Sequence, residues 1–121
     1  MTRMSAGDNK CVVRDVVIAV DLGGTNLRIA VVDRTLRVIR RSKEPTRSAS
    51  GPEAILDRIR KYVDMYMADG NLKVNCMGIA IAGIVDEGSG AVYHGPNLPG
   101  WEGVQVREQL ERIPECPVVV G

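Results

Sequence analysis

Aromatic residues, cysteine and histidine are scarce in this sequence. No phenylalanine occurs among its 121 residues, and one tryptophan with three tyrosines makes up 3% of the chain. The three cysteines, Cys11, Cys76 and Cys116, stand far apart, and there is a single histidine. Because no C-x-x-C pair or cysteine–histidine cluster occurs, the spacing argues against a zinc site and against a disulfide framework. We therefore expect free thiols, as in the reducing cytoplasm.

Long apolar runs and an excess of one charge are also lacking. No apolar stretch is long enough to span a bilayer, and the polar residues 1–10 lack the apolar segment of a signal peptide. The 16 basic and 15 acidic residues leave a net charge of +1, whereas a nucleic-acid surface normally carries a basic excess. We expect a cytoplasmic protein that binds neither membrane nor nucleic acid.

The stretch around which the chain is organised is a glycine-paired turn between two apolar runs. Residues 16–20 and 27–32 have the length and β-branched content of strands. Between them, Gly23 and Gly24 permit positive φ and leave no side chain to block an approaching ligand. The order of glycines is neither that of a Walker A loop nor that of a dinucleotide fingerprint, since a strand follows the turn.

The polar residues of this turn suit an anion. Backbone amides, the Thr25 hydroxyl and the Asn26 amide can hold phosphate oxygens. Asp21, at the end of the first strand, would repel a phosphate unless a divalent cation came between them, and Mg²⁺ bound through a carboxylate and waters meets that need. The pattern favours a hairpin that holds a Mg-nucleotide, while an ordinary hairpin with a Gly-Gly turn remains the alternative.

The rest of the chain alternates strands with helices. Residues 1–14 read as a flexible leader, and the S-x-x-E spacing of residues 50–53 predicts a capping box at the start of a helix. The elements expected after the hairpin are a strand at 36–43, a helix from about 51 to 69, a doubly covered apolar strand at 74–82, a short strand at 91–93, a helix at 102–112 and a last strand from 117. This order predicts an α/β fold with a parallel core.

Two motifs resemble those of a known family. D-L-G-G-T-N-L-R-I-A-V-V-D, residues 21–33, resembles the first phosphate motif of actin-like ATPases and, more closely, that of the ROK family of sugar kinases and repressors. Residues 78–101, G-I-A-I-A-G-I-V-D-E-G-S-G-A-V-Y-H-G-P-N-L-P-G-W, strengthen the match. The resemblance implies a ribonuclease-H-like lobe, whose mixed sheet contains a three-stranded antiparallel meander and is flanked by helices.

The resemblance also implies roles for single residues. It implies ATP and Mg²⁺ as cofactors and a hexose or N-acetylhexosamine as substrate. The implied cofactor-binding residues are Asp21, which would hold Mg²⁺ through water, and Gly23, Gly24, Thr25 and Asn26. Gly83 and Asn97 are the implied sugar contacts, although each also suits a plain turn. Asp86 is expected to stabilise its turn and Trp101 to anchor the second helix; no role is assigned to Arg28.

The catalytic base is not among these residues. In the ROK family its Asp follows the strand that begins here at Pro117, so we expect it just after Gly121. Residues 15–121 are thus expected to be the N-terminal lobe of a sugar kinase, inactive alone and prone to homo-oligomerise through apolar surface. The alternatives are a ROK-type sugar-responsive regulator, which too few residues before the first strand disfavour, and a non-catalytic binding module.

Overall fold

A computed structural model describes residues 13–68, 70–111 and 116–121 of the chain. Along the chain they form the following elements: β1 (Arg14–Leu22), β2 (Asn26–Asp33), β3 (Val38–Pro45), the 3₁₀ turn η2 (Ser48–Ser50), α1 (Pro52–Met67), β4 (Leu72–Ile81), β5 (Ile84–Asp86), β6 (Ala91–His94), α2 (Val106–Leu110) and β7 (Val118–Val120). Most of the leader segment lies outside the described residues, and β1 begins at Arg14, which the sequence had placed in that segment.

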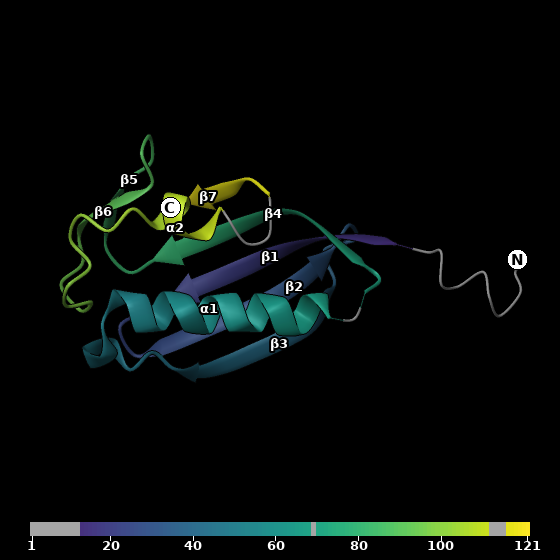
Figure 1. Cartoon of the computed structure of the whole chain (residues 1–121), viewed down its shortest axis with the longest axis horizontal. Helices are drawn as coiled ribbons and strands as arrows, with labels where there is room; N and C mark the ends of the chain where they lie inside the picture. Colours follow the sequence, from purple (N-terminus) through teal and green to yellow (C-terminus); the bar gives the residue numbers. More distant parts are fainter. Residues whose placement is uncertain (1–12, 69, 112–115) are drawn as a thin grey trace, which may run out of the picture.

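Five strands form one mixed sheet in the order β3-β2-β1-β4-β7 (Figure 1). β1 pairs antiparallel with β2 and parallel with β4, and β7 continues the parallel part. β1, β2 and β3 are the expected antiparallel meander. The mixed sheet flanked by helices confirms the expected fold class, and β5 and β6 form a separate hairpin.

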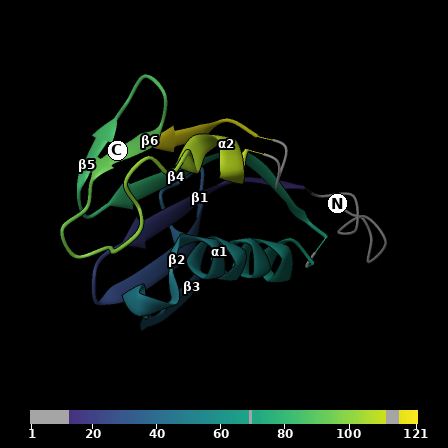
Figure 2. The ribbon, with the colours of Figure 1, turned by 60° about the vertical axis from the view of Figure 1, so that its left-hand side comes forward.

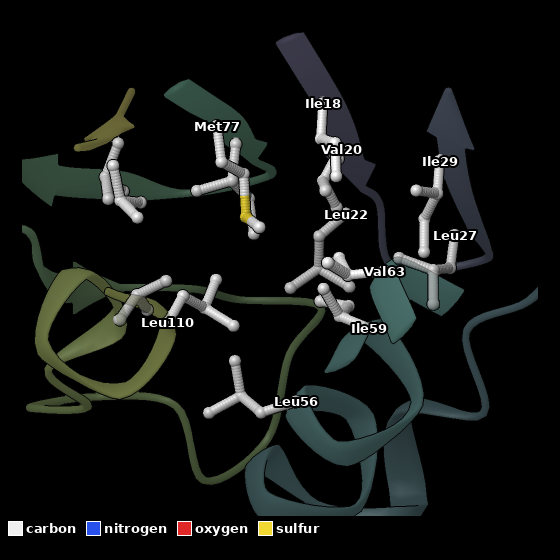
Figure 3. Close-up of a cluster of buried hydrophobic side chains, with 14 of the residues drawn as sticks. Ile18, Val20, Leu22, Leu27, Ile29, Leu56, Ile59, Val63, Met77 and Leu110 are labelled. Carbon is white, nitrogen blue, oxygen red and sulfur yellow. The ribbon is translucent and has the colours of Figure 1, made fainter. Parts of the chain in front are cut away.

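One face of the sheet packs on the helices, because α1 presents an apolar stripe at helical spacing. Its buried residues are Ile55, Leu56, Ile59, Val63 and Tyr66. They meet alternate side chains of β1, β2 and β4, the strand period that places every second residue on one face. Figures 2 and 3 show α1 and α2 on this same side, with Leu56 and Leu110 directed into the shared core.

The opposite face of the sheet is not covered by any described helix. β4 alternates between buried and exposed positions, so the expectation that it is covered on both faces is wrong for the described part of the chain. Small side chains occupy this open face, with Ala19 and Ala80 exposed, and Val119 of β7 is 64% exposed. No described helix has the length and hydropathy that crossing a membrane requires.

Both helices begin later than the sequence indicated. The N-cap of α1 is Gly51 at φ 89°, and no side chain caps it. The Ser50 hydroxyl instead donates to the carbonyl of Arg47 at 2.6 Å, so the capping-box prediction is wrong. α2 begins at Val106 and not at Glu102, because Gly103 adopts φ 83° and its amide donates to the carbonyl of Val92.

The turn between β2 and β3 is longer than expected. Leu36 adopts φ 67° and is exposed, so β3 begins at Val38 and not at residue 36. Asp33 organises this turn, since its carboxylate accepts hydrogen bonds from Thr35 and from the amide of Arg37. These bonds, with Thr35 foremost, lower the pKa of Asp33 to about 2.

Candidate functional site

The glycine turn lies where the carboxyl ends of β1, β4 and β7 meet one edge of the sheet (Figure 1). The amide of Gly23 donates to the carbonyl of Asn26 at 2.9 Å, which closes the hairpin around Gly24 and Thr25. Neither glycine adopts a positive φ; among the described residues, the glycines that do are Gly51, Gly70, Gly90, Gly100 and Gly103. The expectation that this turn uses the left-handed freedom of glycine is therefore wrong.

Close approach of another segment explains why residue 24 is a glycine. A Cβ atom on Gly24 would lie 2.7 Å from the Cβ of Asn97 and 3.2 Å from its carbonyl oxygen. Such a distance is shorter than any ordinary carbon–carbon contact. The loop that carries Asn97 thus rests directly on the turn, and the structure brings together the two motifs that the sequence places far apart.

Gly83 lies at the same edge but is packed against its own chain. A Cβ there would lie 2.4 Å from the carbonyl oxygen of His94 and 3.1 Å from the Cα of Gly95. The neighbouring Ala82 amide donates to the carbonyl of Leu22, the last residue of β1. Gly83 is therefore next to the site, and what approaches it closely in this structure is the end of β6.

Asn97 is exposed, while the residues on either side fix its loop. Leu98 is fully buried, and its amide donates to the carbonyl of Gly95 at 3.0 Å. Trp101 is also fully buried in the cluster that holds Leu110. It thus contributes to the core below α2, as the sequence predicted, and does not face a ligand.

Arg107 of α2 fastens the β5–β6 hairpin that precedes this loop. Its guanidinium donates to the carbonyls of Glu87 and Gly88 at 2.7 and 2.8 Å, and to that of Val118 at 3.1 Å. Asp86 stabilises the hairpin turn as predicted, since its carboxylate accepts the amide of Gly88. Nothing in the local sequence around Arg107 indicates this clamp.

Asp21 faces Arg28 across the hairpin. The two residues are direct partners in the β1–β2 register, and Nη1 of Arg28 lies 3.4 Å from Oδ2 of Asp21. The Asp21 side chain is 58% exposed and that of Arg28 is 54% exposed. An ion pair this exposed stabilises a protein by only about 0–1 kcal/mol. Arg28, to which no role had been assigned, therefore pairs with Asp21 only weakly, which leaves the Asp21 carboxylate accessible to solvent.

The described residues offer no all-protein metal cage. Among them there is no group of three histidine, cysteine or acidic side chains close enough to hold a metal ion. The single carboxylate of Asp21 is nevertheless compatible with Mg²⁺. This ion keeps most of its water ligands and uses one or two carboxylates together with substrate phosphates. A hollow of about 370 Å³ on the open face reaches Asp21, with Arg28, Arg41 and Lys43 beside it, but it does not extend to Asn97.

Two amides of the turn are unpaired. Within the described chain, the N–H groups of Gly24 and Thr25 donate to no backbone acceptor, and the Thr25 hydroxyl and the Asn26 side-chain amide have no hydrogen-bond partner. The carbonyls of Gly23 and Thr25, by contrast, accept from Thr46. The N–H donors of the turn are therefore free, while its carbonyl acceptors are bonded. An anion binds to such an arrangement because it needs hydrogen-bond donors.

Thr46 is fully buried and was not singled out from the sequence. Its hydroxyl donates to the carbonyl of Gly23 at 2.6 Å and its amide to that of Thr25 at 2.8 Å. Arg58 of α1 donates to the carbonyls of Thr46 and Pro45, each at 2.6 Å. The turn is thus joined through one residue to the helix that covers the core.

The carboxylate of Glu44 bonds to the Arg58 side chain that holds Thr46. Nε of Arg58 donates to Glu44 at 2.7 Å, and the hydroxyl of Tyr62 donates to the other carboxylate oxygen. These bonds, that of Tyr62 foremost, lower the pKa of Glu44, and the same contact raises the pKa of Tyr62. The acceptors and donors of this partly buried group are therefore matched at neutral pH.

Comparisons with known proteins identify the family that this chain resembles. The sequence model of the ROK family matches residues 17–121. The chain is 35% identical over 103 residues to a glucokinase of Streptomyces coelicolor, covering 85% of this chain and 31% of that protein. It is 29% identical over 102 residues to an N-acetylmannosamine kinase of Salmonella newport, covering 84% and 34%.

A solved structure is also similar to the chain. The crystal structure of a ROK family glucokinase from Streptomyces griseus in complex with glucose and AMPPNP superposes with a TM-score of 0.73 at 32% identity. The match covers 87% of this chain and 32% of that one. The chain spans about a third of the length of the curated relatives that it matches.

Proposed function

The chain belongs to the ROK family, and from that membership we propose that residues 15–121 form the N-terminal, phosphate-binding lobe of a sugar kinase. The reaction transfers a phosphoryl group from ATP, with Mg²⁺, to a hydroxyl of a hexose or N-acetylhexosamine. A glucokinase and an N-acetylmannosamine kinase among the relatives support these two substrate classes.

The contact between Gly24 and Asn97 carries this proposal. Phosphoryl transfer depends almost entirely on holding the donor phosphate and the acceptor hydroxyl next to each other in line. The turn with free amides and the loop with an exposed Asn97 meet at one sheet edge, so closely that a Cβ added to Gly24 would lie 2.7 Å from that of Asn97. Phosphate and sugar contacts from two distant motifs are thereby adjacent.

Each residue then has a definite task. The amides of Gly24 and Thr25, with the Thr25 hydroxyl, hold phosphate oxygens. Asp21 would hold a hydrated Mg²⁺ in place of its contact with Arg28, and the ion would supply positive charge to the phosphates. Asn97 offers a donor and an acceptor to one sugar hydroxyl and so orients it.

A general base is the remaining requirement. Within the described residues no carboxylate is hydrogen-bonded to Asn97, and Asp21 is committed to Arg28 or the cation. The resemblance to the ROK family supports the proposal that the base Asp lies just after Gly121, and we expect the 121 residues alone to bind nucleotide without turnover. The thiols of Cys76 and Cys116 are free, which suits the cytoplasmic location inferred from composition.

Titration of the isotope-labelled chain with Mg·AMPPNP tests the proposal. We expect backbone amide signals of Gly24 and Thr25 to shift, and EDTA to reverse the shift. Asp21→Asn should weaken the Mg-dependent binding about tenfold, because one ligand contact to a charged group is lost. Asp64→Asn, which removes an exposed carboxylate from α1 far from the turn, is the matched control.

Two outcomes contradict the proposal. If the amide signals of the turn do not shift at millimolar Mg·AMPPNP, the turn is not a phosphate site. Sugar-dependent ATP consumption by the 121-residue chain, abolished by Asp21→Ala, places the base inside these residues instead.

A further inference from the structure

The direction of the Gly24 amide in the turn follows from the hydrogen bond that the preceding carbonyl, that of Gly23, accepts. A peptide group is planar and trans, so its N–H points opposite to its C=O. The hydroxyl of buried Thr46 holds the Gly23 carbonyl at 2.6 Å, and therefore the N–H of Gly24 points away from Thr46. That N–H is one of the two left free for a ligand.

The same hydroxyl bonds to the carbonyl that ordinarily closes such a hairpin. A two-residue β-hairpin is normally closed by two reciprocal bonds between the residues that flank the loop. Here the Gly23 amide donates to Asn26, but no bond runs from the Asn26 backbone amide back to Gly23 within the described residues. The acceptor for that bond, the Gly23 carbonyl, is occupied by Thr46.

Thr46 is itself fixed from α1. The Arg58 guanidinium donates to the carbonyls of Pro45 and Thr46 while it pairs with Glu44. A guanidinium presents its donors in a rigid fork, so three simultaneous bonds define the position of the segment tightly. The side chains of Arg58 and Glu44 are only 18% and 25% exposed, which limits competition from water.

We propose that Thr46, fixed by Arg58, is the positioning residue of the glycine turn: it sets the direction of the Gly24 amide and thereby the affinity for a phosphate anion. This inference rests on the proposed function for its ligand, a nucleoside triphosphate. Thr46 is fully buried and cannot touch that ligand, so it acts through the Gly23–Gly24 peptide.

Thr46→Val tests the inference, because valine keeps the volume and the backbone bond to Thr25 but lacks the hydroxyl. We expect the Gly23 carbonyl to turn to the Asn26 backbone amide, which should then exchange more slowly with solvent, while the Gly24 amide signal shifts. The affinity for Mg·AMPPNP should fall about tenfold, the effect of one misdirected bond to a charged ligand.

Three further variants separate positioning from stability. Thr46→Ser restores a hydroxyl and should stay within about twofold of the wild-type affinity. Arg58→Lys loses the fork and should weaken binding about threefold. Thr35→Val removes a hydroxyl bonded to Asp33 at the opposite end of β2, and should change neither the turn signals nor the affinity.

The outcomes decide between the two roles. If Thr46→Val lowers only the urea midpoint, with the amide signals of Gly24 and Asn26 and the affinity unchanged, Thr46 is merely structural and the inference is overturned. If the wild-type chain does not bind Mg·AMPPNP, the proposed function fails separately. The claim on amide direction then stands or falls on the unliganded Gly24 and Asn26 signals alone.

Discussion

Replacing Gly24 with alanine perturbs the one contact that joins the two motifs of the site. The added Cβ would lie 2.7 Å from the Cβ of Asn97, about 1 Å closer than carbon atoms normally pack. Overpacking of this kind costs about 1–3 kcal/mol, and the lower entropy of the unfolded alanine chain offsets about 0.4–1 kcal/mol. Because Gly24 has no positive φ, no strain is added, and we expect a net loss of about 1–2 kcal/mol.

Urea unfolding measures this loss directly. Trp101 is the single tryptophan and is fully buried, so its fluorescence reports the transition. With an m-value of about 2 kcal/mol/M, the middle of the usual range in urea, the midpoint of Gly24→Ala should fall by about 0.5–1 M. Gly78→Ala is the matched control: it has no positive φ either, a Cβ there meets nothing within 4 Å, and its midpoint should hold or rise.

A double mutant shows whether Asn97 causes the loss. Asn97→Gly removes the Cβ that would collide with alanine at position 24. It should therefore lower the free energy of unfolding less in the Gly24→Ala background than in the wild type. We expect a coupling of about 1 kcal/mol, as for other residues in direct contact. Equal midpoints for Gly24→Ala and Gly78→Ala, or no coupling with Asn97→Gly, would refute the contact on which the proposed function depends.

Three further predictions concern stability and association. Asp33→Asn should lower the urea midpoint at pH 7; since the folded pKa of Asp33 is about 2, below the unfolded value, the difference should vanish as the pH falls to 2. Tyr62→Phe should cost about 1 kcal/mol at pH 7, with a smaller deficit once acid protonates Glu44, whose pKa is lowered; titration of urea midpoints from about pH 2 to 8 checks both. The open sheet face, including Val119, should make the chain self-associate, and a monomer at every concentration in sedimentation velocity contradicts this.

The fold was predictable because its main signals are local. Apolar runs of strand length marked β1, β2 and β4, and helical spacing of Ile55, Ile59 and Val63 marked α1. Helix starts were not predictable, because they depend on competing bonds. Ser50 and Glu53 have the spacing of a capping box. The Ser50 hydroxyl nevertheless donates to the carbonyl of Arg47, three residues earlier, where the chain adopts φ 55°.

The position of the candidate site was predictable, but its construction was not. The sequence located the turn and Asn97 as separate motifs, and attributed Gly24 to backbone freedom and to the approach of a ligand. The structure attributes it to a contact with a residue far along the chain. Thr46 and Arg58 were missed for the same reason, since a threonine after a strand and an arginine on a charged helix face carry no spacing signal.

The sheet order also determines when the fold can be completed during synthesis. β1 is made before both of its partners yet lies in the centre, and its parallel partner β4 comes only after β2, β3 and α1. At about 5–20 residues per second, the ribosome leaves the inner edge of β1 without a partner for several seconds. An unpaired apolar edge is a template for pairing with other chains. The nascent meander is therefore open to pairing with other chains until β4 has been made, and slower translation lengthens that period.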